Sequence, residues 1–191
     1  MIILASESPR RKEILEKLLI EFKSEVSFCD ESLPNGINPE EACVILAKRK
    51  AESVFKENPE DIVIGADTMV VLDNNILGKP SSKEEATDML KKLSGRSHFV
   101  FTGVSIISKD KSMSFYDKTE VKFSVLSDED INFYISTDEP YDKAGSYAIQ
   151  GIGCRFIEKI NGDFYTVMGL PSYKLIKALK VFINLEGNYV Y

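Results

Sequence analysis

The chain has few of the residues that bind soft metals or form covalent cross-links: one histidine and three cysteines in 191 residues. A single histidine, His98, cannot build a histidine-rich metal site. Cys29, Cys43 and Cys154 have neither the close spacing of a zinc site nor the density of a disulfide scaffold. We therefore expect buried or idle thiols, and oxygen ligands for any bound metal.

The chain also lacks a surplus of positive charge and a long apolar run. Its net charge of −6 excludes a nucleic-acid binder that works through a broad basic surface. No segment approaches the roughly 18 apolar residues of a membrane span, so no membrane partner is expected. The opening MIILASESPRR has its arginines after a short apolar stretch, the reverse of a secretory signal, and this predicts a cytoplasmic location.

What the sequence does contain is a mixture of capped helical patterns and short apolar runs. Helices are expected from Pro9, over 39–55, from Ser81-Ser82 to a stop at Gly95, from Ser127 to Ile135, and over 171–183. Strands are expected at 2–5, 61–73, 99–107, 116–125, 147–150, 155–160 and 164–168, the last two joined by a hairpin turn at Asn161-Gly162. This order predicts an α/β fold with a mixed sheet and flanking helices. No linker or repeat interrupts it, so a single domain over 1–191 is expected.

The first candidate for chemistry is Ser6-Glu7-Ser8-Pro9-Arg10-Arg11, where two arginines enter the first turn of a helix. Cations are unfavourable there, because a helix N-terminus already has unpaired N–H groups and partial positive charge. Hydroxyl and guanidinium groups at a strand-to-helix junction are suited to binding phosphate. A serine cap followed by solvated arginines is the alternative.

Asp67 is the second candidate, because it interrupts the apolar run of residues 62–71. A buried ionised aspartate is costly unless it is paired or bound to metal. An aspartate that bonds to a nearby turn remains the alternative.

Several charged residues and one loop are weaker candidates. Lys50 lies at the edge of an apolar helical face, where lysine is unusual, whereas Lys79 lies at a turn and Asp30-Glu31 in an acidic loop. Each can also be a solvated surface group. The polar loop 139–151 ends in Gln150 between glycines, which permit close backbone approach to a ligand, while a glutamine amide can hydrogen-bond a base edge. A purely structural loop is the other interpretation.

Taken together and in order, these segments resemble the Maf family of nucleotide pyrophosphatases, and the match spans nearly the whole chain. The matching motifs are SESPRR at 6–11, the glutamate at 31, LAKRKA at 46–51, GADT at 65–68, LGKP at 77–80, LSGRSH at 93–98, EPYDKAGSYAIQG at 139–151 and INGDFYTVMGLP at 160–171. The resemblance implies metal-dependent hydrolysis of a nucleoside triphosphate to the monophosphate and pyrophosphate. It also implies two lobes around a central cleft, similar to the inosine-triphosphate pyrophosphatases.

The resemblance implies roles for individual residues. Asp67 matches the catalytic proton acceptor and, with Glu31, a ligand set for Mg²⁺ or Mn²⁺; whether Asp67 is base, ligand or both stays open. The positions that match the substrate-binding residues are Ser8, Arg10, Arg11, Lys50, Thr68, Lys79, Lys143 and Gln150. Ala148, where glycine is expected, and Met69 depart from the pattern without touching this charged set.

The stretch DKAGSYAIQG resembles the branch of the family that acts on dTTP and UTP. Two alternatives are kept: a nucleotide-binding regulator of septum formation, and a pyrophosphatase for other or modified nucleotides such as 7-methyl-GTP or ITP. The expected partner is the nucleotide substrate, and the resemblance also admits a homodimer.

Overall fold

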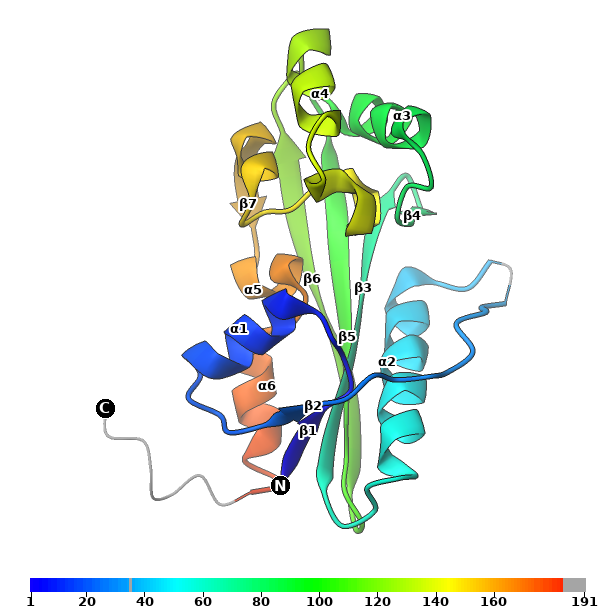
Figure 1. The fold of residues 1–191 in the computed structure, drawn as a ribbon, viewed down its shortest axis with the longest axis vertical. Coiled ribbons are helices and arrows are strands. Elements are labelled where there is room, and N and C mark those ends of the chain that lie inside the picture. The colour runs from blue at the N-terminus through cyan, green and yellow to red at the C-terminus, as the bar shows by residue number, and fades with distance from the viewer. Residues whose placement is uncertain (35, 184–191) are drawn as a thin grey trace. The chain divides into compact units, whose positions relative to one another are not determined.

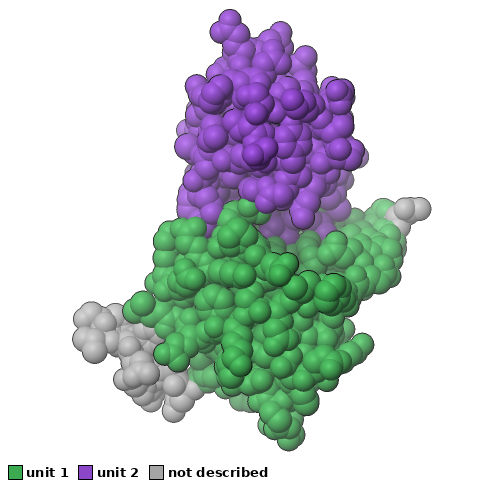
Figure 2. Space-filling view, in the orientation of Figure 1, with its two compact units in different colours: residues 1–67, 102–117, 169–191 green, residues 68–101, 118–168 purple. Residues whose placement is uncertain are grey.

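The computed structural model describes residues 1–34 and 36–183, which form two compact units that interleave in sequence. Unit 1 contains residues 1–67 and 102–117 with the segment from 169 onward, and unit 2 contains residues 68–101 and 118–168 (Figure 2). Strands β3 (Ile62–Leu72), β5 (Ser97–Ile107) and β6 (Ser112–Phe123) each contribute one part to each unit. In the described residues, no helix is long and apolar enough to cross a membrane.

The sheet is mixed, as predicted. Its strand order is β2-β1-β3-β5-β6-β7, and the short β4 (Asn75–Leu77) pairs with β3 (Figure 1). β1 (Ile2–Leu4) is parallel to both β2 (Lys23–Ser24) and β3, whereas β4 is antiparallel to β3 and β7 (Ile157–Asn161) is antiparallel to β6. Together with the flanking helices, this confirms the predicted α/β class.

Helices with strong local signals begin where their caps predict. They are α1 (Pro9–Lys17), α2 (Pro39–Phe55), α3 (Lys83–Leu93), α4 (Asp128–Ile135) and α6 (Ser172–Leu179). The Ser82 side chain accepts the N–H of Glu85, and Ser127 and Asp130 form a reciprocal capping box. Gly95, at φ 69°, follows the end of α3, as expected for a glycine stop. The closing helix α6 ends four residues before the predicted residue 183.

The structure differs from the sequence prediction between residues 139 and 168. Residues 147–150 form no strand, three short 3₁₀ helices occupy Glu139–Asp142, Ala144–Ser146 and Ile152–Phe156, and β7 begins at Ile157. The cause is the Glu139 carboxylate, which accepts the N–H groups of Ile152 and Gly153 at 2.8 and 2.9 Å and so folds this segment into a compact loop.

The predicted hairpin at Asn161-Gly162 is also wrong, because the turn leads into helix α5 (Phe164–Met168). Asp163 accounts for this: its carboxylate accepts the N–H of Tyr165 at 2.9 Å, as an N-capping residue does. The Thr119 hydroxyl fixes the turn, since it accepts the N–H of Asp163 at 2.9 Å and donates to its carbonyl at 3.0 Å. A helix start therefore replaces the expected strand.

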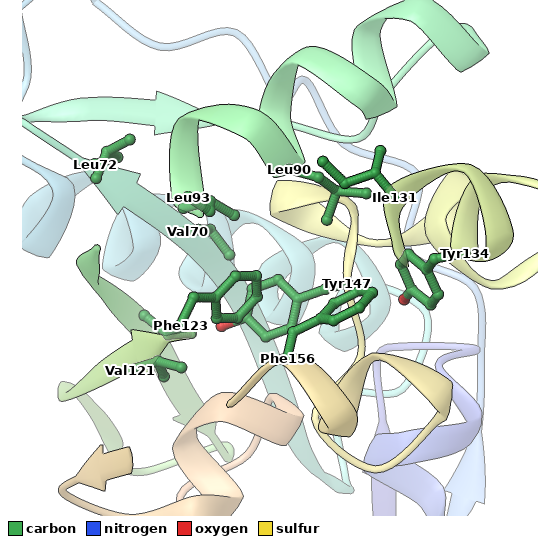
Figure 3. Packing of buried hydrophobic residues seen from close by; sticks show 11 residues of the cluster. Val70, Leu72, Leu90, Leu93, Val121, Phe123, Ile131, Tyr134, Tyr147 and Phe156 are labelled. Carbon is green, nitrogen blue, oxygen red and sulfur yellow. The ribbon is translucent and has the colours of Figure 1, made fainter. Parts of the chain in front are cut away.

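The core of unit 2 is aromatic and encloses the single histidine. Phe123, Tyr147 and Phe156 pack together within the apolar cluster of Figure 3. His98 meets Phe123 and Tyr147 edge to face, and its Nε2 lies 2.7 Å from the Tyr147 hydroxyl oxygen. Its Nδ1 is buried with no hydrogen-bond partner among the described residues. Burial lowers the pKa of His98 to about 4, so the ring is neutral in the folded protein.

The buried His98 should make stability depend on pH. Its folded pKa of about 4 lies below the ordinary 6.5, so the unfolded chain binds the proton first and stability is lost as pH falls from 6.5 toward 4. Relative to His98→Phe, the wild-type free energy of unfolding should fall by up to about 1.4 kcal/mol per pH unit in that window. Urea unfolding at several pH values measures this. Parallel curves for the two proteins would show that the histidine is not held neutral.

Candidate active site

Two glycines bring helix α2 directly against the strands of unit 1. A Cβ added to Gly65 on β3 would lie 2.6 Å from the backbone nitrogen of Ala51, and one added to Gly103 on β5 would lie 2.6 Å from that of Val44. Real Cβ atoms do not approach backbone this closely, so any larger residue would push the helix away. The close contact places the C-terminal half of α2 beside the part of β3 that carries Asp67.

Lys50 of α2 binds two carboxylates at this place. Its Nζ lies 2.6 Å from Asp67 Oδ1 and 2.9 Å from Glu31 Oε1. The side chains of Lys50 and Asp67 are 14% and 13% exposed, whereas that of Glu31 is 62% exposed. The predicted position of the Lys50 stem at the edge of the apolar face is therefore confirmed, with its ammonium group turned to the acids.

The electrostatics favour a charged Lys50. Burial alone would lower its pKa, but attraction to Asp67 and the hydrogen bonds to Asp67 and Glu31 outweigh burial and raise it. Lys50 therefore stays an ammonium held by the two carboxylates.

Arg11 adds a second cation from helix α1. Its Nε donates to the carbonyl of Gly169 at 2.8 Å, and its Nη1 donates to the Ser6 hydroxyl at 3.1 Å. Burial lowers the pKa of Arg11, and the neighbouring Asp67 partly offsets this while Arg10 adds to it. The guanidinium is thus held by unit 1 itself and lies in the electrostatic field of Asp67 and Glu31.

The remaining residues of the N-terminal motif lie at the start of α1. Ser8 is the residue before Pro9, but its side chain makes no capping hydrogen bond, and its N–H instead donates to the Ser6 hydroxyl at 3.2 Å. Ser8 and Arg10 are both half-buried. Of the predicted site residues, unit 1 therefore brings together Glu31, Lys50, Asp67 and Arg11.

The other predicted site residues belong to unit 2. Thr68 directly follows Asp67 on β3 and is half-buried. The loops of Lys79 and Lys143 are joined, because Gly145 N–H donates to the Gly78 carbonyl at 3.0 Å. Lys143 forms an ion pair with Asp142, and Gln150 is exposed.

Two glycines of the 139–151 loop have intramolecular packing roles, and their expected approach to a ligand stays a prediction. A Cβ on Gly151 would overlap the Glu139 carboxylate, and Gly145, at φ 68°, packs against Val70. Glu139 itself was missed as a structural residue: besides two N–H groups, its carboxylate accepts the Tyr134 hydroxyl at 2.8 Å. Glu139 precedes Pro140 in a polar loop, and this local sequence does not predict its long-range partners.

The donor set suits a hard divalent cation that is shared with a ligand. Residues 1–34 and 36–183 contain no group of three or more histidine, cysteine or acidic side chains arranged to hold a metal. Two carboxylates do converge, however, and Mg²⁺ is commonly held by one or two carboxylates together with substrate phosphates and water. Glu31 and Asp67 fit that arrangement. All three cysteines are free thiols, so none forms a disulfide.

Comparison with known proteins finds matches over most of the chain. The family model described as Maf-like protein matches residues 1–182. A dTTP/UTP pyrophosphatase of Bacillus velezensis is 53% identical over 181 residues, which cover 95% of this chain and 96% of the relative. One from Bacillus cereus is 50% identical, with 95% of each chain covered.

A solved structure shares the fold at low sequence identity. The Ham1 protein of Staphylococcus aureus superimposes with a TM-score of 0.52 at 13% identity, covering 95% of this chain and 98% of that protein. The family model and the high identity to the Bacillus relatives show that this chain belongs to the Maf family.

Proposed function

We propose that this protein hydrolyses dTTP and UTP to the nucleoside monophosphate and pyrophosphate with a divalent metal. The observation that carries the proposal is the convergence of Asp67 and Glu31 on the Lys50 ammonium, in a chain about half identical to proteins named dTTP/UTP pyrophosphatase. The interleaving of the two units along the sequence supports treating residues 1–191 as one functional domain.

In the proposed reaction, a water oxygen attacks phosphorus at the anhydride between the α- and β-phosphates. The bond to the bridging oxygen breaks, pyrophosphate leaves, and the proton of the water passes to Asp67 as general base. Lys50 can hold Asp67 in place during this reaction. Its ammonium has three N–H donors, so it can bind both carboxylates and still donate to a phosphate oxygen.

We assign the binding of phosphate to cations that converge near Asp67. Lys50 and Arg11 are already fixed there by contacts within unit 1, so little conformational entropy is lost when they bind. We also assign Arg10 and Ser8, at the start of α1, to phosphate binding, because the N-terminus of a helix favours an anion. Thr68, Lys79, Lys143 and Gln150 are assigned to the substrate on the family resemblance.

Glu31 and Asp67 would hold the metal, Mg²⁺ or Mn²⁺. When bound, the ion supplies Lewis-acid stabilisation of the charge that develops on the phosphate oxygens. The pair offers oxygen ligands only, which supports a hard cation over zinc.

A nucleotide sensor without turnover is the alternative from another class. Binding alone needs cations for the phosphates but no proton acceptor. The half-buried Asp67, held by a lysine, favours catalysis, because a carboxylate costs free energy to bury and repels a triphosphate. From the sequence we further propose that the enzyme acts on free nucleotides in the cytoplasm. The family resemblance admits a homodimer and leaves the oligomeric state open.

Asp67→Asn should keep the fold and nucleotide binding but lose most pyrophosphate release, roughly a hundred- to ten-thousand-fold in kcat, because the amide cannot accept the proton. Lys50 keeps Glu31 as a charged partner, so stability should change little. Asp73→Asn is the matched control, since Asp73 is an exposed aspartate paired with Arg96. Equal turnover in the wild type and Asp67→Asn would remove Asp67 from the mechanism.

Metal removal should abolish activity, and Mg²⁺ or Mn²⁺ should restore it. Glu31→Gln should then need a higher metal concentration for half-maximal rate, because it loses one of two carboxylate ligands. Pyrophosphate release measured across a metal titration tests both points. Full activity after exhaustive chelation would contradict the metal-dependent mechanism.

A panel of UTP, dTTP, CTP, 7-methyl-GTP and ITP should show UTP and dTTP as the best substrates, with pyrophosphate and not orthophosphate released. The Gln150 amide offers both a donor and an acceptor, which complement O4 and N3–H of a uracil or thymine ring, whereas cytosine reverses the pattern. Gln150→Glu replaces the donor by an acceptor and should lower kcat/KM for UTP more than for CTP. A preference for 7-methyl-GTP or ITP would assign the enzyme to another branch of the family. Nucleotide binding without hydrolysis would support the alternative of a nucleotide sensor.

A further inference from the structure

The segment that carries Glu31 belongs to unit 1. Residues 25–34 belong to no helix or strand. From Glu25 to Asp30, exposure nevertheless alternates, with half-buried side chains at the odd positions and exposed ones at the even positions. Successive side chains of an extended chain point to opposite sides, so this pattern gives the segment one inner and one outer side.

Apolar burial does not hold this segment in register. Phe28, its largest apolar residue, is 85% exposed, and Val26 is 42% exposed. A shift of one residue would exchange the inner and outer sets of side chains at little hydrophobic cost, and Glu31 would move with them. The register must therefore come from polar contacts.

Helix α2 supplies those contacts from consecutive turns. The Ser53 hydroxyl donates to the Phe28 carbonyl at 2.8 Å. Arg49 Nη1 donates to the carbonyls of Asp30 and Ser32 at 2.9 and 2.6 Å. The acceptors are alternate residues, 28, 30 and 32, which identifies one register and excludes the shifted one.

We propose that Arg49 is the residue that positions Glu31. This proposal rests on the proposed function only for the role of Glu31 in metal binding. Arg49 holds the backbone carbonyls on both sides of Glu31, and the next residue of the helix, Lys50, contacts the Glu31 carboxylate at 2.9 Å. Arginine suits the task because two N–H groups of its rigid planar head can bind two carbonyls together. Without Arg49, the backbone on both sides of Glu31 loses its side-chain contacts from α2.

The first test reads the position of the segment without any reaction. The chain contains no tryptophan, so Phe28→Trp introduces a single tryptophan, which can be excited selectively over the tyrosines, at an exposed site of the segment. In that background, Arg49→Ala should lower the fluorescence anisotropy of the new tryptophan. Lys48→Ala, which removes a neighbouring exposed cation paired with Glu52, should leave it unchanged. Ser53→Ala, which removes the contact to Phe28 itself, should lower it as well.

The second test links Arg49 to Glu31 through a double-mutant cycle. Arg49→Ala should raise the Mg²⁺ concentration for half-maximal UTP hydrolysis about tenfold, with little change in KM for UTP at saturating metal. In the Glu31→Gln background the same substitution should have no further effect, because the residue it positions is gone. Arg49→Lys should fall between wild type and Arg49→Ala in both measurements, and it serves in place of Arg49→Ala if that variant does not fold.

Two results would overturn the proposal: an unchanged anisotropy in Arg49→Ala, or the same fold-change in metal requirement with and without Glu31→Gln. If the wild type releases no pyrophosphate, the proposed function fails, and the anisotropy alone then decides whether Arg49 positions the segment.

Discussion

The ion pair between Lys50 and Asp67 is the interaction on which the candidate site depends. Both side chains are largely withdrawn from water, and their 2.6 Å contact must offset the desolvation of two charges. An apolar pair of similar volume would often stabilise such a position as well or better. A buried ion pair is therefore weak evidence for a stabilising role and better evidence for a chemical one. Removing Lys50 would take the ammonium away from the largely buried Asp67 carboxylate, whereas removing the charge of Asp67 leaves Lys50 paired with Glu31.

That ion pair in turn depends on backbone contact between α2 and the sheet. Gly65 and Gly103 have no side chains to separate the helix from β3 and β5, and Ala47 and Ala51 are the small residues that α2 presents to this contact. Gly65, two residues before Asp67, thus has a structural role: it allows α2 to lie close enough to β3 for Lys50 to reach the Asp67 carboxylate. Packing and chemistry are specified by the same few residues of one strand.

Sequence reasoning succeeded where the deciding interactions are local. The caps at Ser82 and Ser127, the stop at Gly95 and the apolar face of residues 39–55 are each contained within a few residues, and the helices follow them. It failed between residues 139 and 168, where several partners are distant in sequence and where the local N-cap at Asp163 follows a dipeptide that predicts a hairpin turn. Nothing near Ile152 reveals that Glu139 accepts its N–H, and nothing near Asp163 reveals Thr119. The candidate site divides in the same way: Lys50 and Asp67 stood out as charges in apolar patterns, whereas no local pattern distinguishes Arg49.

The two carboxylates around Lys50 are supported by different means, and this has a chemical consequence. Asp67 belongs to a central strand and is fixed by the ladder hydrogen bonds of the sheet, whereas Glu31 belongs to an extended segment that polar side chains of α2 hold. The segment can adjust at a lower cost than the strand, because few apolar contacts resist it. When both carboxylates bind a cation, Glu31 would therefore move more than Asp67. Asp67 then keeps its place relative to Lys50, which a proton acceptor needs when its geometry must be ready before the substrate arrives.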